Sequence, residues 1–264
     1  MSFNTSIYEK FILNEIAPYL GKITKRMRQV KSIGSRSKSI NKFDPVTHYD
    51  LKIERELTKI ILKKFPNHQI EGEETKSFKT SKKFKWIIDP IDGTKSFIVG
   101  MPTYSNLIGL EIDTIESLGF AYFPELEKYY YTSNNHSFVF EKGKRRKIFT
   151  SKKKELKNSK LVINTLNTVK NYKFLKFFKN YKNFFKITGA DAYNYCRLAE
   201  GKIDIIIEAN LKPFDIKPVI PIIKKSGGVI TDWSGNQNLN KGDVIASANK
   251  KLHKKILNIF KKIK

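Results

Sequence analysis

The chain has 264 residues, of which 40% are hydrophobic and 12% aromatic. This length supports one large domain or two packed lobes, and the composition excludes an intrinsically disordered chain. The net charge is +26, but only seven of the 51 basic residues are arginine, on which specific nucleic-acid readers depend. We therefore attribute the charge to a general lysine bias and predict no specific nucleic-acid recognition.

The cysteine count and the apolar runs bear on the cellular compartment. Cys196 is the only cysteine, so no disulfide forms within the chain. The first ten residues lack the basic and apolar regions of a signal peptide, and no apolar run approaches the ~20 residues that span a bilayer. We expect a cytoplasmic protein without a membrane span.

Two helices are predicted near the start of the chain. Apolar residues at helical spacing predict a helix over 7–30, which Pro18 interrupts or kinks. A loop rich in Ser, Lys and Gly is expected over 31–42. A second amphipathic helix is predicted over 47–65, with Thr47 as its cap.

A run of strands follows. A buried strand is predicted over 84–89, ending at Pro90, and Thr94 is expected to open a short helix. Further strands are predicted over 104–112, 117–123, 129–132 and 137–141. This succession indicates a sheet with helices on one face.

Helices and strands alternate in the second half. Strands are predicted over 161–163, 203–208 and 227–232, and helices over 170–181, 190–200 and 216–225. Such alternation is typical of an α/β lobe. We therefore expect an N-terminal α+β lobe over 1–149 and a C-terminal α/β lobe over 150–264.

The C-terminal segment 250–264 predicts a basic amphipathic helix. Its apolar face carries Leu252, Ile256, Ile259, Phe260 and Ile263. One interpretation is an anchor for a membrane surface or nucleic acid. We favour a terminal helix packed on the second lobe with its lysines outside, because core packing requires such an apolar stripe.

The strongest chemical signal is the string Asp89-Pro-Ile-Asp92-Gly93-Thr94. Two carboxylates held close together repel each other, and hard oxygen ligands of this kind suit Mg²⁺. Gly93 allows close backbone approach to a ligand, and a helix opening at Thr94 would present N–H groups to phosphate. The string therefore predicts a metal and phosphate site.

Further acidic residues are candidates to complete this site. Alone, Glu73-Glu74 would be a solvated surface pair and Asp215 a helix cap. They gain significance only as members of a set with Asp89 and Asp92.

At these positions the chain resembles the inositol monophosphatase superfamily. The resemblance rests on Gly72-Glu73-Glu74, the string over 89–94, Pro213-Phe-Asp215 and Gly227-Gly228, and it covers nearly the whole chain. It implies a sugar-phosphatase-like α/β (α+β) fold, a layered αβαβα sandwich of two lobes. It also implies Mg²⁺-dependent hydrolysis of a small phosphorylated metabolite, in a protein that is commonly a homodimer.

The resemblance also implies residue roles. Two or three Mg²⁺ ions would be held by the carboxylates of Glu73, Asp89, Asp92 and Asp215 and by the carbonyl of Ile91. The backbone of Gly93 and Thr94 would bind phosphate. The attacking water would be oriented by Thr94 and Asp50, with Glu73 nearby.

Within the superfamily the second lobe is most similar to the histidinol-phosphatase branch. That branch hydrolyses a cationic substrate, for which Asp191 and Glu208 are the candidate contacts, although Asp191 is equally explained as a helix cap. The chain departs from the branch at Ile187 and over 190–192. Inositol-1-monophosphatase and other small sugar or nucleotide phosphatases remain alternatives, as does a non-enzymatic protein that binds RNA or acidic membrane.

Overall fold

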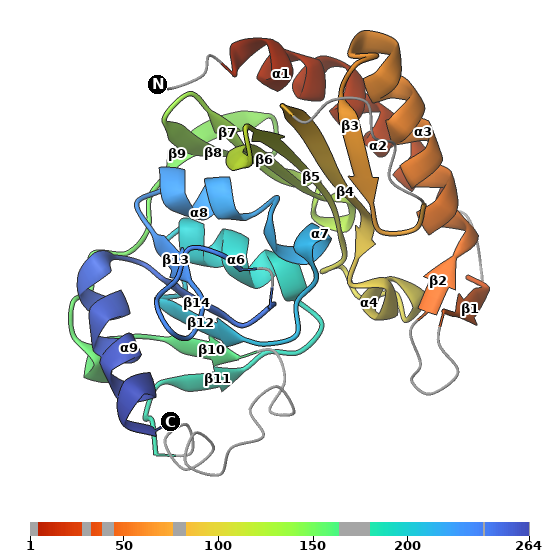
Figure 1. Ribbon diagram of the computed structural model, residues 1–264. Helices are drawn as coiled ribbons and strands as arrows, with labels where there is room; N and C mark the ends of the chain where they lie inside the picture. The colour runs from red at the N-terminus through yellow and green to blue at the C-terminus, as the bar shows by residue number, and fades with distance from the viewer. Residues whose placement is uncertain are drawn as a thin grey trace.

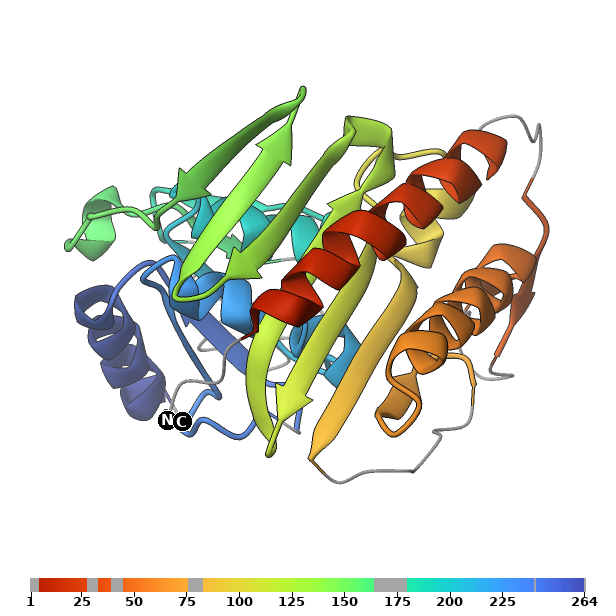
Figure 2. The same ribbon diagram turned by 90° about the horizontal axis from the view of Figure 1, so that it is seen from above.

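The computed structural model describes residues 5–27, 33–38, 45–75, 83–163, 180–239 and 241–263. These residues form alternating layers of helix and sheet (Figures 1 and 2). The predicted layered α/β fold class is therefore confirmed, whereas its division into two domains at residue 150 stays a prediction. The helix predicted over 170–181 lies almost entirely outside the described residues.

The helices of the described residues are mostly short. They are α1 Ser6–Phe11, α2 Ala17–Met27, α3 His48–Lys64, α4 Thr94–Ile98, α6 Asp191–Ala199, α7 Pro213–Ile216, α8 Ile220–Lys225 and α9 Lys250–Ile263. A π-helical turn spans Ile12–Ile16, and single 3₁₀ turns span Pro124–Leu126 and Leu156–Asn158. None of the described helices has the length and hydropathy to cross a membrane.

The larger sheet has seven strands in chain order. Only its first pair, β3 and β4, is parallel. The strands are β3 Gln69–Gly72, β4 Phe84–Asp92, β5 Ser105–Ile112, β6 Ile115–Phe123, β7 Lys128–Ser133, β8 His136–Glu141 and β9 Lys144–Ile148. A separate small ladder joins β1 Ser35–Ser37 to β2 Pro45–Thr47.

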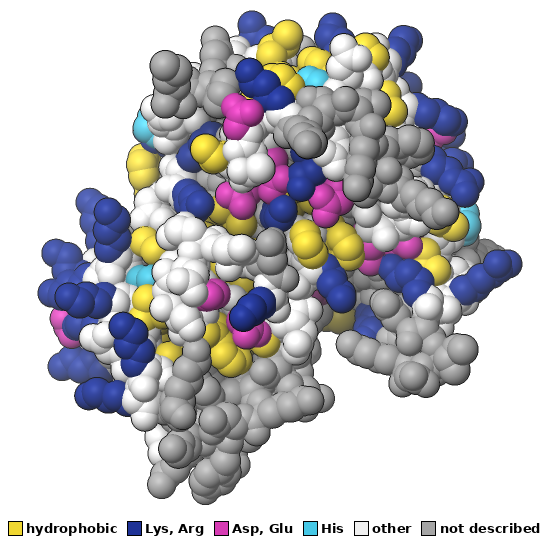
Figure 3. Space-filling model, in the orientation of Figure 1, with side chains coloured by type: hydrophobic (Ala, Val, Ile, Leu, Met, Phe, Trp, Pro, Cys, Tyr) yellow, Lys and Arg dark blue, Asp and Glu magenta, His cyan; other side chains and the backbone are white. Residues whose placement is uncertain are grey.

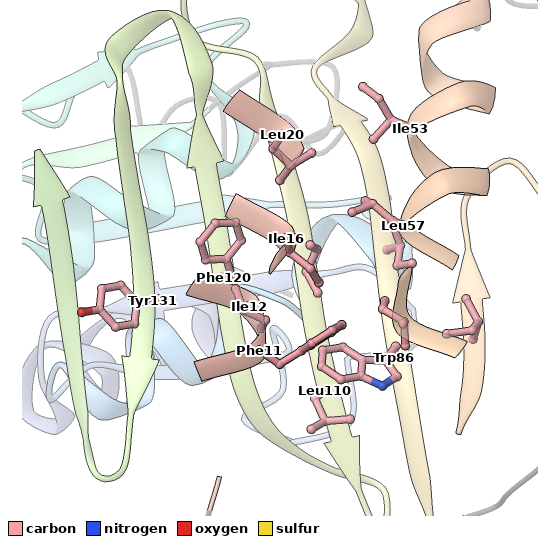
Figure 4. Close-up of a cluster of buried hydrophobic side chains, with 14 of the residues drawn as sticks. Phe11, Ile12, Ile16, Leu20, Ile53, Leu57, Trp86, Leu110, Phe120 and Tyr131 are labelled. Carbon is pink, nitrogen blue, oxygen red and sulfur yellow. The ribbon is translucent and has the colours of Figure 1, made fainter. Parts of the chain in front are cut away.

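One face of the larger sheet packs against the first three helices. Side chains alternate along β4, so Trp86 and Ile88 lie on this face. Figure 4 shows the side chains of the first helix and of α3 meeting the sheet residues, and those labelled are Phe11, Ile12, Ile16, Leu20, Ile53, Leu57, Trp86, Leu110, Phe120 and Tyr131. This apolar contact fixes α3 on the sheet that carries β4.

The first helix continues past Pro18, so of the two predicted effects of this proline an interruption is wrong, whereas a local distortion is present as a π-helical turn. The segments α1, the π-helical turn and α2 follow one another without a break (Figure 2). Proline lacks an N–H group and clashes with the carbonyl four residues earlier. The π-helical turn, in which the Ala17 N–H donates to the Ile12 carbonyl five residues earlier, provides a wider turn just before the proline.

The smaller sheet has the strand order β11-β10-β12-β14-β13 and is mixed. Its strands are β10 Leu161–Ile163, β11 Phe184–Lys186, β12 Ile205–Glu208, β13 Val229–Thr231 and β14 Val244–Ser247. Helices α6 and α8 lie between the two sheets (Figure 1). On the outer face α9 buries Leu252, Ile256 and Phe260, which confirms the packed-helix interpretation of the C-terminal segment.

The helix predicted over 216–225 is not continuous. Helix α8 begins at Ile220, and a turn over 217–219 separates it from α7, which ends at Ile216. Pro218 causes the division, because it has no N–H and disfavours helical geometry at the residue before it. The turn is important for the site, since it begins two residues after Asp215.

Acidification should destabilise the protein through His253. This residue is buried on α9, where its ring nitrogens lie 2.9 Å from Thr231 Oγ1 and 3.1 Å from Ser247 Oγ. Burial lowers the pKa of His253 from 6.5 to about 4. Between these pH values the unfolded chain binds more protons than the folded protein. The free energy of unfolding therefore decreases as the pH is lowered from 6.5 to 4, by at most about 3 kcal/mol.

Urea unfolding of the wild type and of His253→Gln at pH 7, 6 and 5 measures this loss as the difference between the two proteins, because the other titrating groups are common to both. An NMR titration in which the His253 ring becomes protonated near pH 6.5 in the folded protein would contradict the prediction.

Candidate metal and phosphate site

A β-bulge at the end of β4 brings Asp89 and Asp92 onto one face. Asp89 pairs with Leu107 and Asp92 pairs with Ser105, so the two residues between them on β4 oppose a single residue on β5. Residues three apart on a regular strand point to opposite faces, but one extra residue restores the same face. Both carboxylates are buried, and they face the layer that contains α7.

Asp215 approaches them from α7. One carboxylate oxygen from each of Asp89, Asp92 and Asp215 lies within 4.8 Å of the other two. Oδ2 of Asp215 accepts from the Lys212 N–H at 2.7 Å, which holds the side chain at the start of the helix. Oδ1 of Asp89 is buried and has no hydrogen-bond partner in the described part of the chain. Three convergent carboxylates, one of which has an unsatisfied oxygen, fit a hard divalent cation.

The electrostatics of the cluster point the same way. Burial, and then the neighbouring carboxylates Glu73, Asp92 and Asp215, raise the pKa of Asp89 well above its usual value. Burial and the charges of Asp191 and Asp215 do the same to Asp92. Burial also raises the pKa of Asp215 to about 6, against the hydrogen bond from Lys212. A divalent cation would reverse these shifts, because it stabilises the ionised carboxylates.

Glu73 lies beside this cluster but is not one of its three converging residues. Its N–H donates to the Ile88 carbonyl at 3.2 Å, and its Oε1 lies 2.6 Å from Lys38 Nζ. Lys38 also contacts Glu74, at 2.8 Å. Burial raises the pKa of Glu73 to about 7, with Lys38 opposing and Glu74 and Asp215 reinforcing the shift. The metal role of Glu73 therefore stays a prediction.

Sequence reasoning missed Glu54, which holds the segment that carries Glu73. Glu54 is fully buried on α3 and accepts hydrogen bonds from the N–H groups of Glu74 and Thr75, both at 2.8 Å. A Cβ on Gly72 would lie 2.2 Å from Glu54 Oε1, so the glycine is required for this approach. The available signal was spacing, since Glu54 follows Asp50 by one helical turn.

The same helix positions the threonine of the central string. Asp50 forms a capping box with Thr47, which donates to Asp50 Oδ2 through its backbone N–H at 2.7 Å. The other oxygen of Asp50 lies 3.5 Å from Thr94 Oγ1, which also donates to the Ile91 carbonyl at 3.1 Å. Asp50, Thr94 and Ile91 are therefore brought together, as the resemblance implies. Their catalytic, phosphate-binding and metal-binding roles stay predictions.

Gly93 marks the turn between strand and helix. Its φ of +77° lies in the left-handed region that favours glycine, and α4 begins at the next residue. A Cβ at this position would lie 3.1 Å from Asp191 Oδ2. Gly93, one of the two residues predicted to bind phosphate, thus follows Asp92 in the chain and borders Asp191.

The two predicted substrate contacts differ in their surroundings. Asp191 is the first residue of α6 rather than its cap, since Ala190 occupies the cap position, and its carboxylate borders Gly93. Glu208 is only 2% exposed and accepts a hydrogen bond from the Tyr195 hydroxyl at 2.5 Å. The structure therefore brings Asp191 to the candidate site, whereas Glu208 lies behind Tyr195 instead of facing an open cleft.

Charge is distributed unevenly around this region. Figure 3 shows acidic side chains gathered across the middle of the viewed face, with basic side chains beside them and over α9. A surface that carries both signs of charge in this way attracts anions such as phosphate esters as well as cations.

Metal binding should be detectable as stabilisation. Mg²⁺ at 100 times its Kd should add about 2.7 kcal/mol to the free energy of unfolding. Asp89→Asn should remove this response, yet it should raise the melting temperature in EDTA, because it removes one of the mutually repelling buried charges.

Thermal unfolding with EDTA and with a Mg²⁺ series tests both effects. The matched control is Asp113→Asn, a change at an exposed hairpin residue with φ of 50°, which asparagine tolerates. A Mg²⁺ response that persists in Asp89→Asn would rule out this residue as a ligand.

Comparison with known proteins gives a matching family model and several similar proteins. A family model described as "Inositol monophosphatase family" matches residues 9–264. A "Fructose-1,6-bisphosphatase/inositol-1-monophosphatase" of Aquifex aeolicus is 32% identical over 224 residues, 83% of each chain. A "Histidinol-phosphatase" of Chlorobaculum parvum is 29% identical over 258 residues, 92% of this chain and 93% of the relative.

The fold has counterparts among solved structures. The structure of an inositol monophosphatase from Zymomonas mobilis superposes with a TM-score of 0.81 at 24% identity, covering 98% of this chain and 99% of the other. At this identity the likeness concerns the fold alone.

Proposed function

The chain belongs to the inositol monophosphatase family, and from this membership and its acidic cluster we propose that it is a Mg²⁺-dependent phosphatase of small phosphate monoesters. The observation that carries the proposal is the convergence of Asp89, Asp92 and Asp215 beside the turn at Gly93. A bound Mg²⁺ would supply charge neutralisation and an acidified water molecule. The chain's own residues would supply the remaining functions.

Positioning of water and phosphate falls to the central string and α3. Thr94 Oγ1 lies between Asp50 Oδ1 and the Ile91 carbonyl, so its hydroxyl has a fixed direction and its lone pairs remain available to a water molecule. Asp50 is itself held by its capping box and is fully buried. Water held here would attack phosphorus as the bond to the alcohol oxygen breaks, with phosphate oxygens on the N–H groups of Gly93 and Thr94.

For the substrate we propose histidinol phosphate. The support is the similarity to a relative named histidinol-phosphatase and the position of Asp191, whose carboxylate borders the phosphate turn. A carboxylate at this place would pair with the ammonium group of a cationic phosphate ester. Inositol monophosphate and fructose bisphosphate are the alternatives, given the name of the Aquifex aeolicus relative.

Phosphate release from a small panel tests this proposal. The panel contains histidinol phosphate, inositol monophosphate, fructose 1,6-bisphosphate and a 3′,5′-nucleotide bisphosphate, each with Mg²⁺ and with EDTA. We expect Mg²⁺-dependent release that is greatest from histidinol phosphate and falls at least ~100-fold in Asp92→Asn, as expected on loss of a metal ligand. Asp113→Asn should retain full activity.

Phosphate release from another ester alone would support the proposed phosphatase activity and reject histidinol phosphate as its substrate. No release from any ester, by a folded protein that binds Mg²⁺, would overturn the proposed function.

Replacement of Asp191 tests the substrate directly. Asp191→Asn should raise KM for histidinol phosphate ~10-fold or more, because it removes a charge-assisted contact worth roughly 1.5–3 kcal/mol. For neutral inositol monophosphate the change in KM should be several-fold smaller. Equal changes in KM for both esters would mean that Asp191 does not recognise the cation.

A further inference from the structure

Two glycines face each other on neighbouring strands of the larger sheet. Gly109 on β5 is the register partner of Gly119 on β6, and Gly109 is also opposite Ile87 on β4. The alternation of side chains places Ile87 on the same face as Asp89, two residues later. The glycine pair therefore lies on the face that carries the metal cluster and close to it.

The turn between α7 and α8 rests directly on this pair. A Cβ on Gly119 would lie 2.1 Å from the carbonyl oxygen of Pro218, and a Cβ on Gly109 would lie 3.2 Å from its Cα. No real Cβ contact is as short as the first, so the backbone of Pro218 occupies space that any other residue at 119 would fill. Pro218 is buried there, three residues after Asp215.

An ion pair ties the same turn to the same strand. Lys217 Nζ lies 2.7 Å from Glu111 Oε1, and Lys85 Nζ lies 2.6 Å from Glu111 Oε2. Glu111 follows Gly109 by two residues on β5 and thus shares its face. Its side chain is 5% exposed, and an ion pair with such burial and a second cation on the other oxygen has a defined geometry.

The turn is one of the attachments that fix Asp215 against β4, together with the Lys212 N–H and the buried neighbour Ile216. Asp215 belongs to a helix of four residues, α7, and the turn over 217–219 that packs on the two glycines follows this helix immediately. Burial and neighbouring negative charge oppose the approach of its carboxylate to Asp89 and Asp92. The position of Asp215 must therefore be imposed by the packing of the segment that carries it.

We propose that Gly109 and Gly119, together with the Glu111–Lys217 ion pair, are positioning residues that set the distance of Asp215 from Asp89 and Asp92, and thereby the affinity for Mg²⁺. This inference rests on the proposed function for the identity of the metal. None of the four residues touches the metal, and they act only through the turn over 217–219.

Isothermal titration of the metal-free proteins with Mg²⁺ tests the positioning role of the two glycines. Gly119→Ala should weaken Mg²⁺ binding ~10–100-fold, the range found for supporting residues of metal sites. Gly109→Ala, whose Cβ meets a longer contact, should cause a smaller loss. The control is Gly21→Ala on α2, where the nearest atom to a new Cβ is 3.8 Å away, and it should bind Mg²⁺ like the wild type.

A lysine pair separates positioning from simple electrostatics. Removal of a cation near a metal site should tighten Mg²⁺ binding through charge alone. If Lys217 positions Asp215, Lys217→Met should instead weaken binding several-fold. Lys224→Met, on α8 with a long 3.8 Å contact to Glu116, is the matched control and should leave the affinity within about twofold.

The outcomes are distinct. Folded Gly119→Ala with wild-type affinity, or tighter binding in Lys217→Met, would overturn the inference. If Gly119→Ala does not fold, Gly109→Ala and Lys217→Met decide by the same criterion. Binding of Mg²⁺ without phosphate release from any ester would refute the proposed function and leave this test valid, whereas absence of Mg²⁺ binding by the wild type would overturn the inference.

Discussion

Mutual repulsion among buried carboxylates is the constraint on which the candidate site depends. Asp89 and Asp92 come from a strand of the larger sheet and Asp215 from the helical layer beneath it, and their oxygens converge within 4.8 Å. Burial, and then the neighbouring carboxylates, raise the pKa of all three side chains, as expected for acidic groups held together without a cation. The members of this cluster repel one another, so attraction between them cannot be the reason that they converge. The rest of the structure must hold them together by contacts that do not involve the repelling groups.

These contacts are backbone geometry and close packing. The bulge in β4 aligns two of the carboxylates, and the left-handed turn at Gly93 places the following helix beside them. Helix α3 acts twice, since Asp50 orients Thr94 and Glu54 fastens the segment that carries Glu73. The apolar contact of α3 with the sheet makes both attachments rigid. In each case backbone geometry or a side chain other than the three carboxylates restrains a residue of the candidate site.

Local features of the site could be predicted from the sequence, and contacts between distant segments could not. The string from Asp89 to Thr94 encodes strand, turn and helix within a few residues, so its chemistry was evident. Glu54 and the glycines 109 and 119 gave no comparable signal, because their significance depends on which segment approaches them in space. Pro18 shows the converse, where a local rule predicted an interruption that a π-helical turn accommodates. Asp215 was identified only through the family resemblance, since a proline-led helical turn alone indicates a cap.

The negative charge of the carboxylates would couple the binding of a metal ion to the binding of a charged substrate. Asp191 raises the pKa of Asp92 and Asp215, so its charge belongs to the cluster although it lies on α6 beside the phosphate turn. A cationic group bound at Asp191 would reduce the repulsion among the carboxylates, and an additional anionic group there would increase it. Because coupling between two ligands is reciprocal, bound Mg²⁺ and the charge of the substrate would influence each other's affinity. Under the proposed function, substrate preference would therefore depend on the whole carboxylate cluster as well as on Asp191.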